Sequence, residues 1–172
     1  MKKSFWFFVA IIVIVVFAAP VSAISDSQKN NIVENCESIK DTLKTIQHQD
    51  SRTRVYLGRY YETILSKYIT PLNVRLVENN ILNNDLIENQ DSFSKMRNSF
   101  IIDFIEYQRR LDELVAMDCK SSPESFYNKL VKVRERRKVV ESDTSVMKEL
   151  MKSQLTLVKE LKGKLWLQVE EN

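Results

Sequence analysis

The fold of this chain is decided by residues 32–64, IVENCESIKDTLKTIQHQDSRTRVYLGRYYETI. Positions suited to a buried face advance along this stretch by alternating steps of four and three residues, which is the heptad spacing of a helix packed along one side. The spacing keeps its phase through the polar region, at Ile32, Cys36, Ile39, Leu43, Ile46, Asp50, Thr53, Leu57, Tyr60 and Ile64. The stretch therefore predicts one long helix rather than two short ones.

Signals at both ends bound this helix. Ser25, with Gln28 three residues later, forms a capping-box pattern at its start. Pro71 disfavours helical angles at Thr70, which predicts an end or a kink there. Residues 71–84 then predict a shorter helix followed by a bend or hairpin tip in an asparagine-rich corner made of Asn79, Asn80, Asn83 and Asn84.

Two more long helices follow. Residues 86–115 carry a wide apolar face that comprises Leu86, Phe93, Met96, Phe100, Ile101, Phe104, Ile105, Leu111, Leu114 and Val115. Ser122 and Pro123 supply an N-cap and a first-turn proline for the third helix. Its seam runs through Phe126, Leu130, Val133, Arg137, Val140, Thr144, Met147, Met151, Gln154, Val158, Leu161 and Leu165.

Composition supports an all-α fold. Only two glycines and three prolines occur in 172 residues, whereas sandwiches, barrels and Rossmann sheets need these residues at many tight turns. We expect an elongated antiparallel three-helix bundle with coiled-coil-like heptad seams, with a four-helix bundle as the alternative. Residues 24–165 form one domain in this interpretation, and residues 166–172 form a flexible tail.

Residues 1–23 have the order of a secretory signal peptide, with two lysines, an apolar run from Phe5 to Ala19 and small residues up to Ala23. Cleavage is expected after Ala23, and an uncleaved membrane anchor is the alternative. Removing Lys2 and Lys3 leaves 24 basic and 23 acidic residues, a net charge of +1. A nearly neutral domain has no bulk electrostatic reason to bind nucleic acid.

The chain has two cysteines, Cys36 and Cys119, and in an exported protein they are expected to form a disulfide. Free thiols and a zinc site are the alternatives, although His48 is the only histidine that could join a set of four ligands. Facing positions of an antiparallel hairpin have residue numbers with a constant sum. A Cys36–Cys119 pair centres the hairpin between residues 77 and 78, inside residues 71–84, where the bend is predicted independently.

The same rule places Asp50 level with Ile105, and a second hairpin centred near residue 121 places Ile105 level with Arg137. We therefore expect Asp50 and Arg137 to form a buried ion pair that fixes the register of the helices. A polar ligand site is the alternative interpretation.

The densest aromatic and basic patch lies in residues 52–61. Tyr and Arg are enriched in the hot spots of protein interfaces, so a partner-binding patch is expected at Arg52, Tyr56, Arg59 and Tyr61. Gly58 costs helix stability, which suggests that another group approaches it closely. The alternative is a solvated helix surface on which Tyr60 fills the seam.

The sequence carries no catalytic signature: it has no metal-binding pattern on a helix, no glycine-rich phosphate loop and no nucleophile elbow. We expect no enzyme activity and no cofactor. A basic cluster between Lys129 and Lys138 lacks interleaved aromatic residues, so nucleic-acid binding is not expected.

Two segments carry a resemblance, DSRTRVYLGRYYE at residues 50–62 and DCKSSPESFYNKLVKVRERR at residues 118–137. They resemble exported helical proteins of reduced-genome, episymbiotic bacteria of the candidate phyla group, a group of proteins without known chemistry. The resemblance implies a bacterial envelope or a secreted setting and assigns no functional residue.

Together these features predict an exported interaction or structural module of the cell envelope or the extracellular space, with a protein partner. A membrane association is expected only if the signal segment is retained, and a monomer is preferred to a homo-oligomer. The alternative function is a holdase-like or partner-loading chaperone, which would leave contiguous apolar surface open near the bend at residues 71–84.

Overall fold

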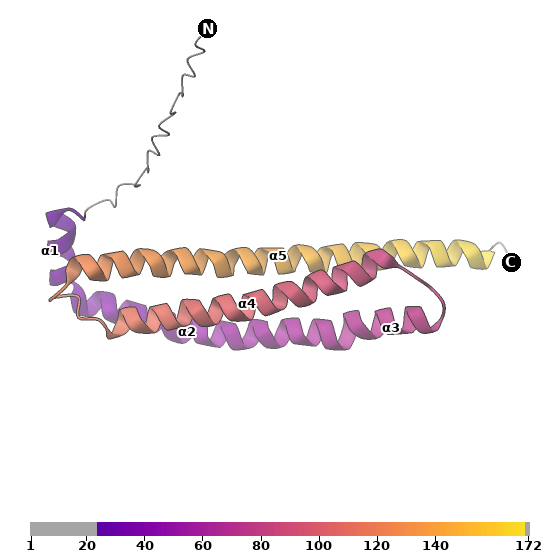
Figure 1. Ribbon diagram of the computed structural model, residues 1–172, viewed down its shortest axis with the longest axis horizontal. Helices are drawn as coiled ribbons and strands as arrows, with labels where there is room; N and C mark the ends of the chain where they lie inside the picture. Colours follow the sequence, from indigo (N-terminus) through magenta and orange to yellow (C-terminus); the bar gives the residue numbers. More distant parts are fainter. Residues whose placement is uncertain (1–23, 171–172) are drawn as a thin grey trace, which may run out of the picture.

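The computed structural model describes residues 24–170, with side chains as far as Trp166 (Figure 1). The proposed signal segment, residues 1–23, lies outside the described residues. The described part is all-helical and has no strand. Its elements are α1 (Asp26–Glu34), α2 (Cys36–Ile64), a π-helical turn η1 (Leu65–Ile69), α3 (Thr70–Glu78), α4 (Asn84–Ala116) and α5 (Pro123–Glu170).

Three rods lie side by side in Figure 1. The first is α2 continued by η1 and α3, the second is α4 running back along it, and the third is α5 running antiparallel to α4. Among the described residues, α4 packs against both other rods, while α2 and α5 approach each other much less closely. The arrangement is a helical bundle in which α4 forms the floor between two separated helices.

Aromatic side chains from α4 fill the core. Phe93 and Phe100 are fully buried, and each meets the ring of Tyr61 from α2 edge to face, at centroid distances of 6.3 and 5.3 Å. Edge-to-face contacts are the favoured geometry for such rings. Ile105, expected in the core, is 49% exposed, and Tyr107 is buried instead, because α4 turns residue 107 rather than residue 105 toward the other two rods.

The expected single helix from Ser25 is divided at Asn35. The capping box forms as predicted, with the Ser25 hydroxyl accepting from the Gln28 N–H. Asn35 then leaves helical geometry at φ −103° and ψ 15°, and α1 turns away from α2 across the end of the bundle (Figure 1). Ile32 of α1 is buried at this end of the bundle. Packing of α1 against the bundle end therefore takes the place of the single straight helix that was expected.

Pro71 neither ends the helix nor leaves it regular. The rod widens into the π-helical turn η1 just before the proline, and the Thr70 N–H donates to the Leu65 carbonyl five residues earlier. A proline ring clashes with the carbonyl four residues before it, and a widened turn relieves such a clash. The helix therefore resumes as α3 in nearly the same direction (Figure 1).

The asparagine-rich corner is the hairpin tip, as predicted. Asn80 adopts a left-handed φ of 58°, a conformation that asparagine tolerates better than most residues. The Ile81 N–H then closes back on the Leu76 carbonyl at 2.8 Å. Asn83 caps α4 by accepting from the Leu86 N–H at 3.1 Å, which satisfies one of the free donors at the helix start.

Facing residues of both hairpins have residue numbers with a nearly constant sum, as predicted. Contacts between α2 and α4 join residues 47 with 112, 51 with 108, and 62 with 97, pairs that share one sum of residue numbers. Contacts between α4 and α5 join residues 113 with 129 and 89 with 154, centred near residue 121 as expected. The two hairpins are therefore antiparallel and in the predicted register to within one helical turn.

Residues 166–170 of the expected tail are helical, and residues 171–172 lie outside the described residues. α5 continues through Gly163 to Glu170 and spans 48 residues, about 72 Å at 1.5 Å per residue. Leu161 and Leu165 are partly buried and face Leu72 and Leu76 of α3 across a shared hollow. Apolar side chains of α3 and α5 therefore line this end of the bundle as far as Leu165 and Trp166.

Candidate binding groove

Because α2 and α5 are held apart on α4, a groove runs between the first rod and α5. Four hollows follow one another along it. On the α5 side they are lined by residues from Leu130 to Arg137, from Arg137 to Thr144, from Met151 to Val158 and from Val158 to Trp166. We call this feature the α2–α5 groove, and its two ends proximal, near the disulfide, and distal.

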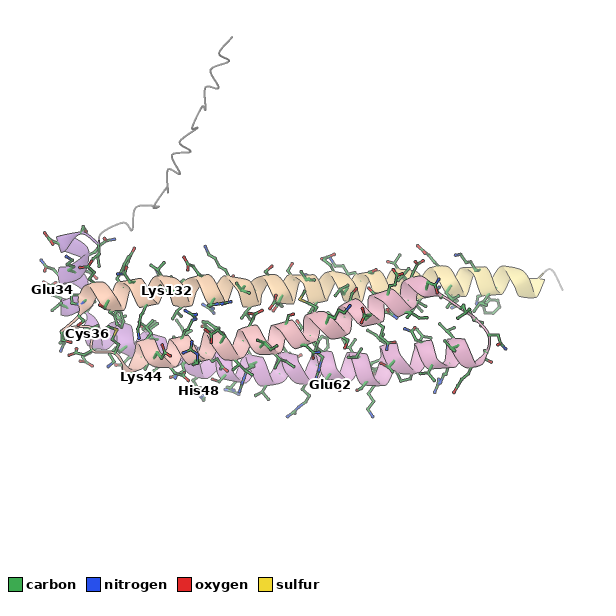
Figure 2. All side chains as sticks on the ribbon, in the orientation of Figure 1. Glu34, Cys36, Lys44, His48, Glu62 and Lys132 are labelled. Carbon is green, nitrogen blue, oxygen red and sulfur yellow. A yellow bond between two sulfur atoms is a disulfide. The ribbon has the colours of Figure 1, made fainter. Side chains whose placement is uncertain are left out.

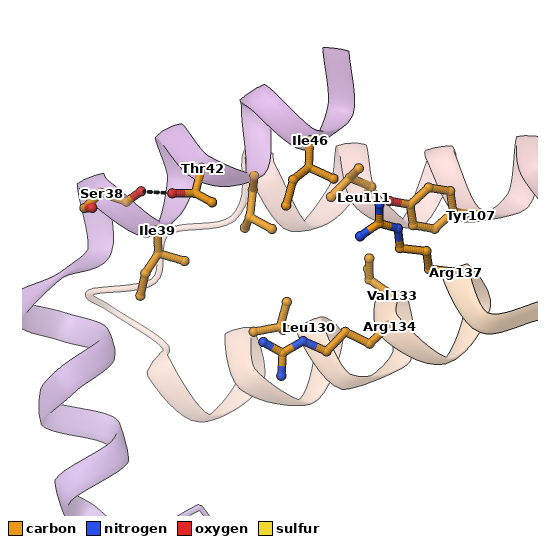
Figure 3. Close-up of a pocket in the computed structure, with 11 residues that line it drawn as sticks. Ser38, Ile39, Thr42, Ile46, Tyr107, Leu111, Leu130, Val133, Arg134 and Arg137 are labelled. Carbon is orange, nitrogen blue, oxygen red and sulfur yellow. Dashed lines mark hydrogen bonds between the residues drawn. The ribbon is translucent and has the colours of Figure 1, made fainter. Parts of the chain in front are cut away.

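The proximal hollow is shown in Figure 3. Ile39 and Ile46 of α2 point toward Leu130 and Val133 of α5 across an open space, and Leu111 of α4 lies at its floor. On the α2 side of the hollow, the Thr42 hydroxyl is already satisfied, because it donates to the carbonyl of Ser38 at 2.9 Å. The base of the hollow is apolar because isoleucine, leucine and valine side chains line it.

A polar layer separates this hollow from the next. The Tyr107 hydroxyl donates to Asp50 Oδ2 at 2.6 Å, and Arg137 Nη2 lies 3.5 Å from Asp50 Oδ1. Burial, and then the Asp50 carboxylate, raise the pKa of Tyr107 well above its ordinary value, so the phenol stays a hydrogen-bond donor. We call Asp50, Tyr107 and Arg137 the polar layer.

The structure brings Asp50 and Arg137 together, but their pair is not buried. The Asp50 side chain is 14% exposed, whereas that of Arg137 is 47% exposed. Arg137 reaches Asp50 from the groove, and its Nε lies 3.9 Å from Glu141 as well. Because the open groove separates α2 from α5, water reaches the guanidinium, and the expected fully buried pair is not formed.

The distal hollows are mainly apolar. One has a volume of about 580 Å³ and is lined by Tyr60, Tyr68, Leu72, Leu155 and Val158 among others. The next is lined by six apolar residues from α3 and α5 and by Lys162. Large side chains are exposed to solvent here: Tyr68 is 67%, Leu155 56% and Trp166 61% exposed. Exposed apolar side chains of the first rod and α5 meet on one face here, which makes this face a candidate binding surface.

The expected partner patch is not one surface. Arg52 and Arg59 are exposed, and Tyr56 is 68% exposed and stacks on Tyr60 with ring centroids 6.3 Å apart. Tyr61 is 2% exposed and belongs to the core, because its position on α2 faces α4. A Cβ at Gly58 would meet nothing within 4 Å, so the expected close approach is wrong.

Cys36 and Cys119 form a disulfide with Cα atoms 5.7 Å apart. Cys36 opens α2 at the end of the bundle, as Figure 2 shows, and Cys119 lies in the loop between α4 and α5. Both residues are buried. The bridge ties the first rod to the loop that starts the third, so it fixes the proximal end of the groove.

Comparisons with known proteins add no relative to this picture. Family models, curated proteins and solved structures give no match to this chain. Within residues 24–170, no helix combines the length and the apolar character that a membrane span requires. Over the same residues, no group of three or more His, Cys, Asp or Glu side chains is placed to hold a metal ion.

Sequence reasoning missed a polar hollow on the opposite side of α2. It contains His48, Ser51 and Asp112, residue types that can act in hydrolysis. The Ser51 hydroxyl donates to the Gln47 carbonyl at 2.7 Å and accepts from Gln108 at 2.8 Å. Asp112 accepts from Gln47 at 2.6 Å. These contacts join α2 to α4, and none of them pairs the serine with a base.

Two buried polar contacts between α4 and α5 were also missed. Asn89 donates to Gln154 Oε1 at 2.7 Å, and the buried Asp143 lies close to Asp103. Burial first, and then the charge of Asp103, raise the pKa of Asp143. The sequence places Gln154 on the seam, but which polar residues face one another depends on the rotation of both helices.

Proposed function

We propose that this chain is an exported helical-bundle interaction module that binds a protein partner outside the cytoplasm and performs no catalysis. The α2–α5 groove is the observation that supports this proposal. It is long and largely apolar at its base, and it lies between two helices that both pack on α4. Burial of exposed side chains such as Tyr68, Leu155 and Trp166 by a partner would supply most of the binding free energy.

The disulfide supports export. Disulfides persist in oxidising compartments and are rare in the cytosol, and the bridge between Cys36 and Cys119 has ordinary Cα separation. The signal-like order of residues 1–23 agrees with this setting. An intact mass of the protein recovered outside the cytoplasm tests the proposal. The expected mass lacks residues 1–23 and two hydrogens, and a full-length reduced mass would contradict export.

Position-specific crosslinking in the producing cell tests partner binding. A photoreactive residue at Leu155, on the groove wall and 56% exposed, should trap a protein. The matched control is Ile102 on α4, which is 66% exposed and lies on the opposite side of α4 from the groove floor residues Phe104 and Tyr107. Equal trapping at both positions, or trapping at neither, would refute an interaction module that uses this groove.

A holdase-like chaperone is the second candidate. The bend leaves Val74, Val77 and Leu82 exposed by 50%, 51% and 76%, which is the kind of open apolar surface that a client-binding protein needs. A chaperone should suppress aggregation of an unrelated reduced client protein in proportion to its concentration. Such suppression, lost in Leu82→Ser and Val77→Ser variants, would favour the chaperone over the selective module.

A further inference from the structure

The α2–α5 groove has the repeat of an α-helix. Each of its four hollows covers seven to nine residues of α5, and between the second and the third hollow, from Thr144 to Met151, one such interval lines none of the four. Seven residues are two helical turns, about 10.5 Å along the axis. A helix lying in the groove with apolar residues at heptad spacing would place a layer of side chains into each hollow and one further layer over the closed interval between Thr144 and Met151.

The α5 wall of this groove is basic. Its outer edge advances by alternating steps of four and three residues and so stays on one side of the helix. It consists of Arg134, Lys138, Glu141, Ser145, Lys148, Lys152, Leu155, Lys159, Lys162 and Trp166. This basic edge contains six cations and one carboxylate. Every residue of it is exposed, and Arg134, Glu141, Leu155, Lys162 and Trp166 line the hollows themselves.

The opposite wall does not neutralise the basic edge. The α2 residues that line the hollows are apolar or uncharged, apart from Asp50. Asp50 already accepts from Tyr107 and faces Arg137. Lys152 of the basic edge pairs with Glu149 of the same helix, which lies outside the edge, at 2.7 Å. The remaining cations flank the groove in the positions that select a partner's charge in coiled coils.

We propose that the α2–α5 groove binds an amphipathic α-helix of another protein, with apolar residues at heptad spacing and acidic residues beside them. The inference rests on the proposed function and deepens it by naming the chemistry of the partner. A second copy that docks through its own α5 does not fit, because the two basic edges would repel each other. A flat anionic membrane would meet the rims of the groove and leave its floor uncovered.

Two synthetic helical peptides test the charge preference. Both are about four heptads long with leucine at the core positions, and they differ only in having glutamate or lysine at the flanking positions. The protein used is the exported form with its disulfide intact. Fluorescence anisotropy should show the glutamate peptide binding at least about tenfold more tightly at low salt. The difference should shrink as salt screens the charges.

Charge reversal on α5 locates the binding. The variant Lys148→Glu with Lys159→Glu changes the basic edge and should lower the affinity for the glutamate peptide and raise it for the lysine peptide. The matched control, Lys132→Glu with Lys164→Glu, changes two exposed lysines of the same helix that lie away from the groove. It should leave both affinities unchanged. Circular dichroism verifies that both variants keep the helical fold.

Several outcomes would overturn the inference. They are a lysine peptide that binds as well as the glutamate peptide, no binding of either peptide, and a control variant that loses binding like the edge variant. Concentration-dependent dimers that disappear in a Leu155→Arg variant would identify a second copy as the occupant. Binding to vesicles of anionic lipid that competes with the glutamate peptide would identify a membrane surface. Specific crosslinking at Leu155 with failure of the peptides would leave the proposed function standing and remove only this inference.

Discussion

At the scale of single residues, Tyr107 decides how Asp50 is satisfied. Sequence spacing placed Asp50 and Arg137 at one level, and the structure brings them within 3.5 Å. The shorter contact, 2.6 Å, comes from Tyr107, which is 1% exposed. A buried hydrogen bond to a carboxylate is stronger than a half-exposed ion pair.

This difference gives a prediction. Tyr107→Phe should lower the free energy of unfolding by about 1 to 2 kcal/mol, because Asp50 loses its buried donor. Arg137→Met should change it by less than about 1 kcal/mol, because the guanidinium is half exposed and screened. Urea denaturation of the two variants measures both values. A larger loss in the Arg137 variant would mean that the ion pair, not the phenol, stabilises the layer.

Asp143 predicts a pH dependence of stability. Its pKa in the folded protein lies above the ordinary value of 3.8 because of burial and then the nearby Asp103. The folded state therefore holds the proton more tightly than the unfolded chain. The resulting stabilisation is complete below pH 3.8 and is lost as the pH rises through the raised pKa.

Asp143→Asn removes the carboxyl group whose ionisation lowers stability as the pH rises. The variant should be more stable than the unmodified protein at pH 7, and the difference should close as the pH falls toward 4. Urea midpoints between pH 4 and pH 8 test this. Glu160→Gln, a change at an exposed carboxylate of the same helix, should show no such closing difference. A constant gap across the pH range would exclude titration of Asp143 as the cause.

At the scale of elements, the helices follow local rules except where packing at the ends intervenes. The capping box at Ser25, the asparagine corner and the start of α5 at Pro123 are all where sequence patterns place them. The break at Asn35 and the π-helical turn η1 were not predicted in these forms. Burial of α1 against the bundle end and the bulk of Pro71 explain the two differences.

Gly58 gives the prediction at this scale. It lies inside α2, and an added Cβ would meet no atom within 4 Å. Gly58→Ala should therefore raise the free energy of unfolding by about 1 kcal/mol, because alanine loses less backbone entropy in a helix. Thermal denaturation measures the gain, and Gly163→Ala, equally open, should behave in the same direction. A destabilised Gly58→Ala variant would reveal a close neighbour at this position.

At the scale of the whole molecule, the disulfide joins points 83 residues apart and so constrains two helical rods at once. Closing a loop of this length stabilises a fold by about 4 to 5 kcal/mol in the chain-entropy model. Reduction, or Cys36→Ser with Cys119→Ser, should lower the melting temperature by roughly 10 to 15 °C while the helical circular dichroism spectrum persists. The double variant itself should be insensitive to reductant. An unchanged melting temperature on reduction would show that packing alone holds the bundle ends together.

The candidate groove was only partly predictable. Asp50, Arg137, Cys36 and Cys119 were placed correctly relative to one another because antiparallel rods of equal rise bring facing positions to one level. Tyr61 was assigned to the surface and is buried, while Ile105 was assigned to the core and is half exposed. A rotation of a fraction of a helical turn separates these outcomes, and a sequence period does not specify it that finely.

The sequence by itself determined the helical class, the hairpin turns and the antiparallel order of the rods, because each depends on local backbone preferences and on the constant rise of a helix. It predicted the cysteine pairing from the signal-like segment and the oxidising setting that this segment implies. Only the tertiary structure decided that α2 and α5 stand apart on α4 and leave a groove between them. The separation of two helices depends on the sizes of all the side chains packed between three rods, and no single stretch of the chain contains that information.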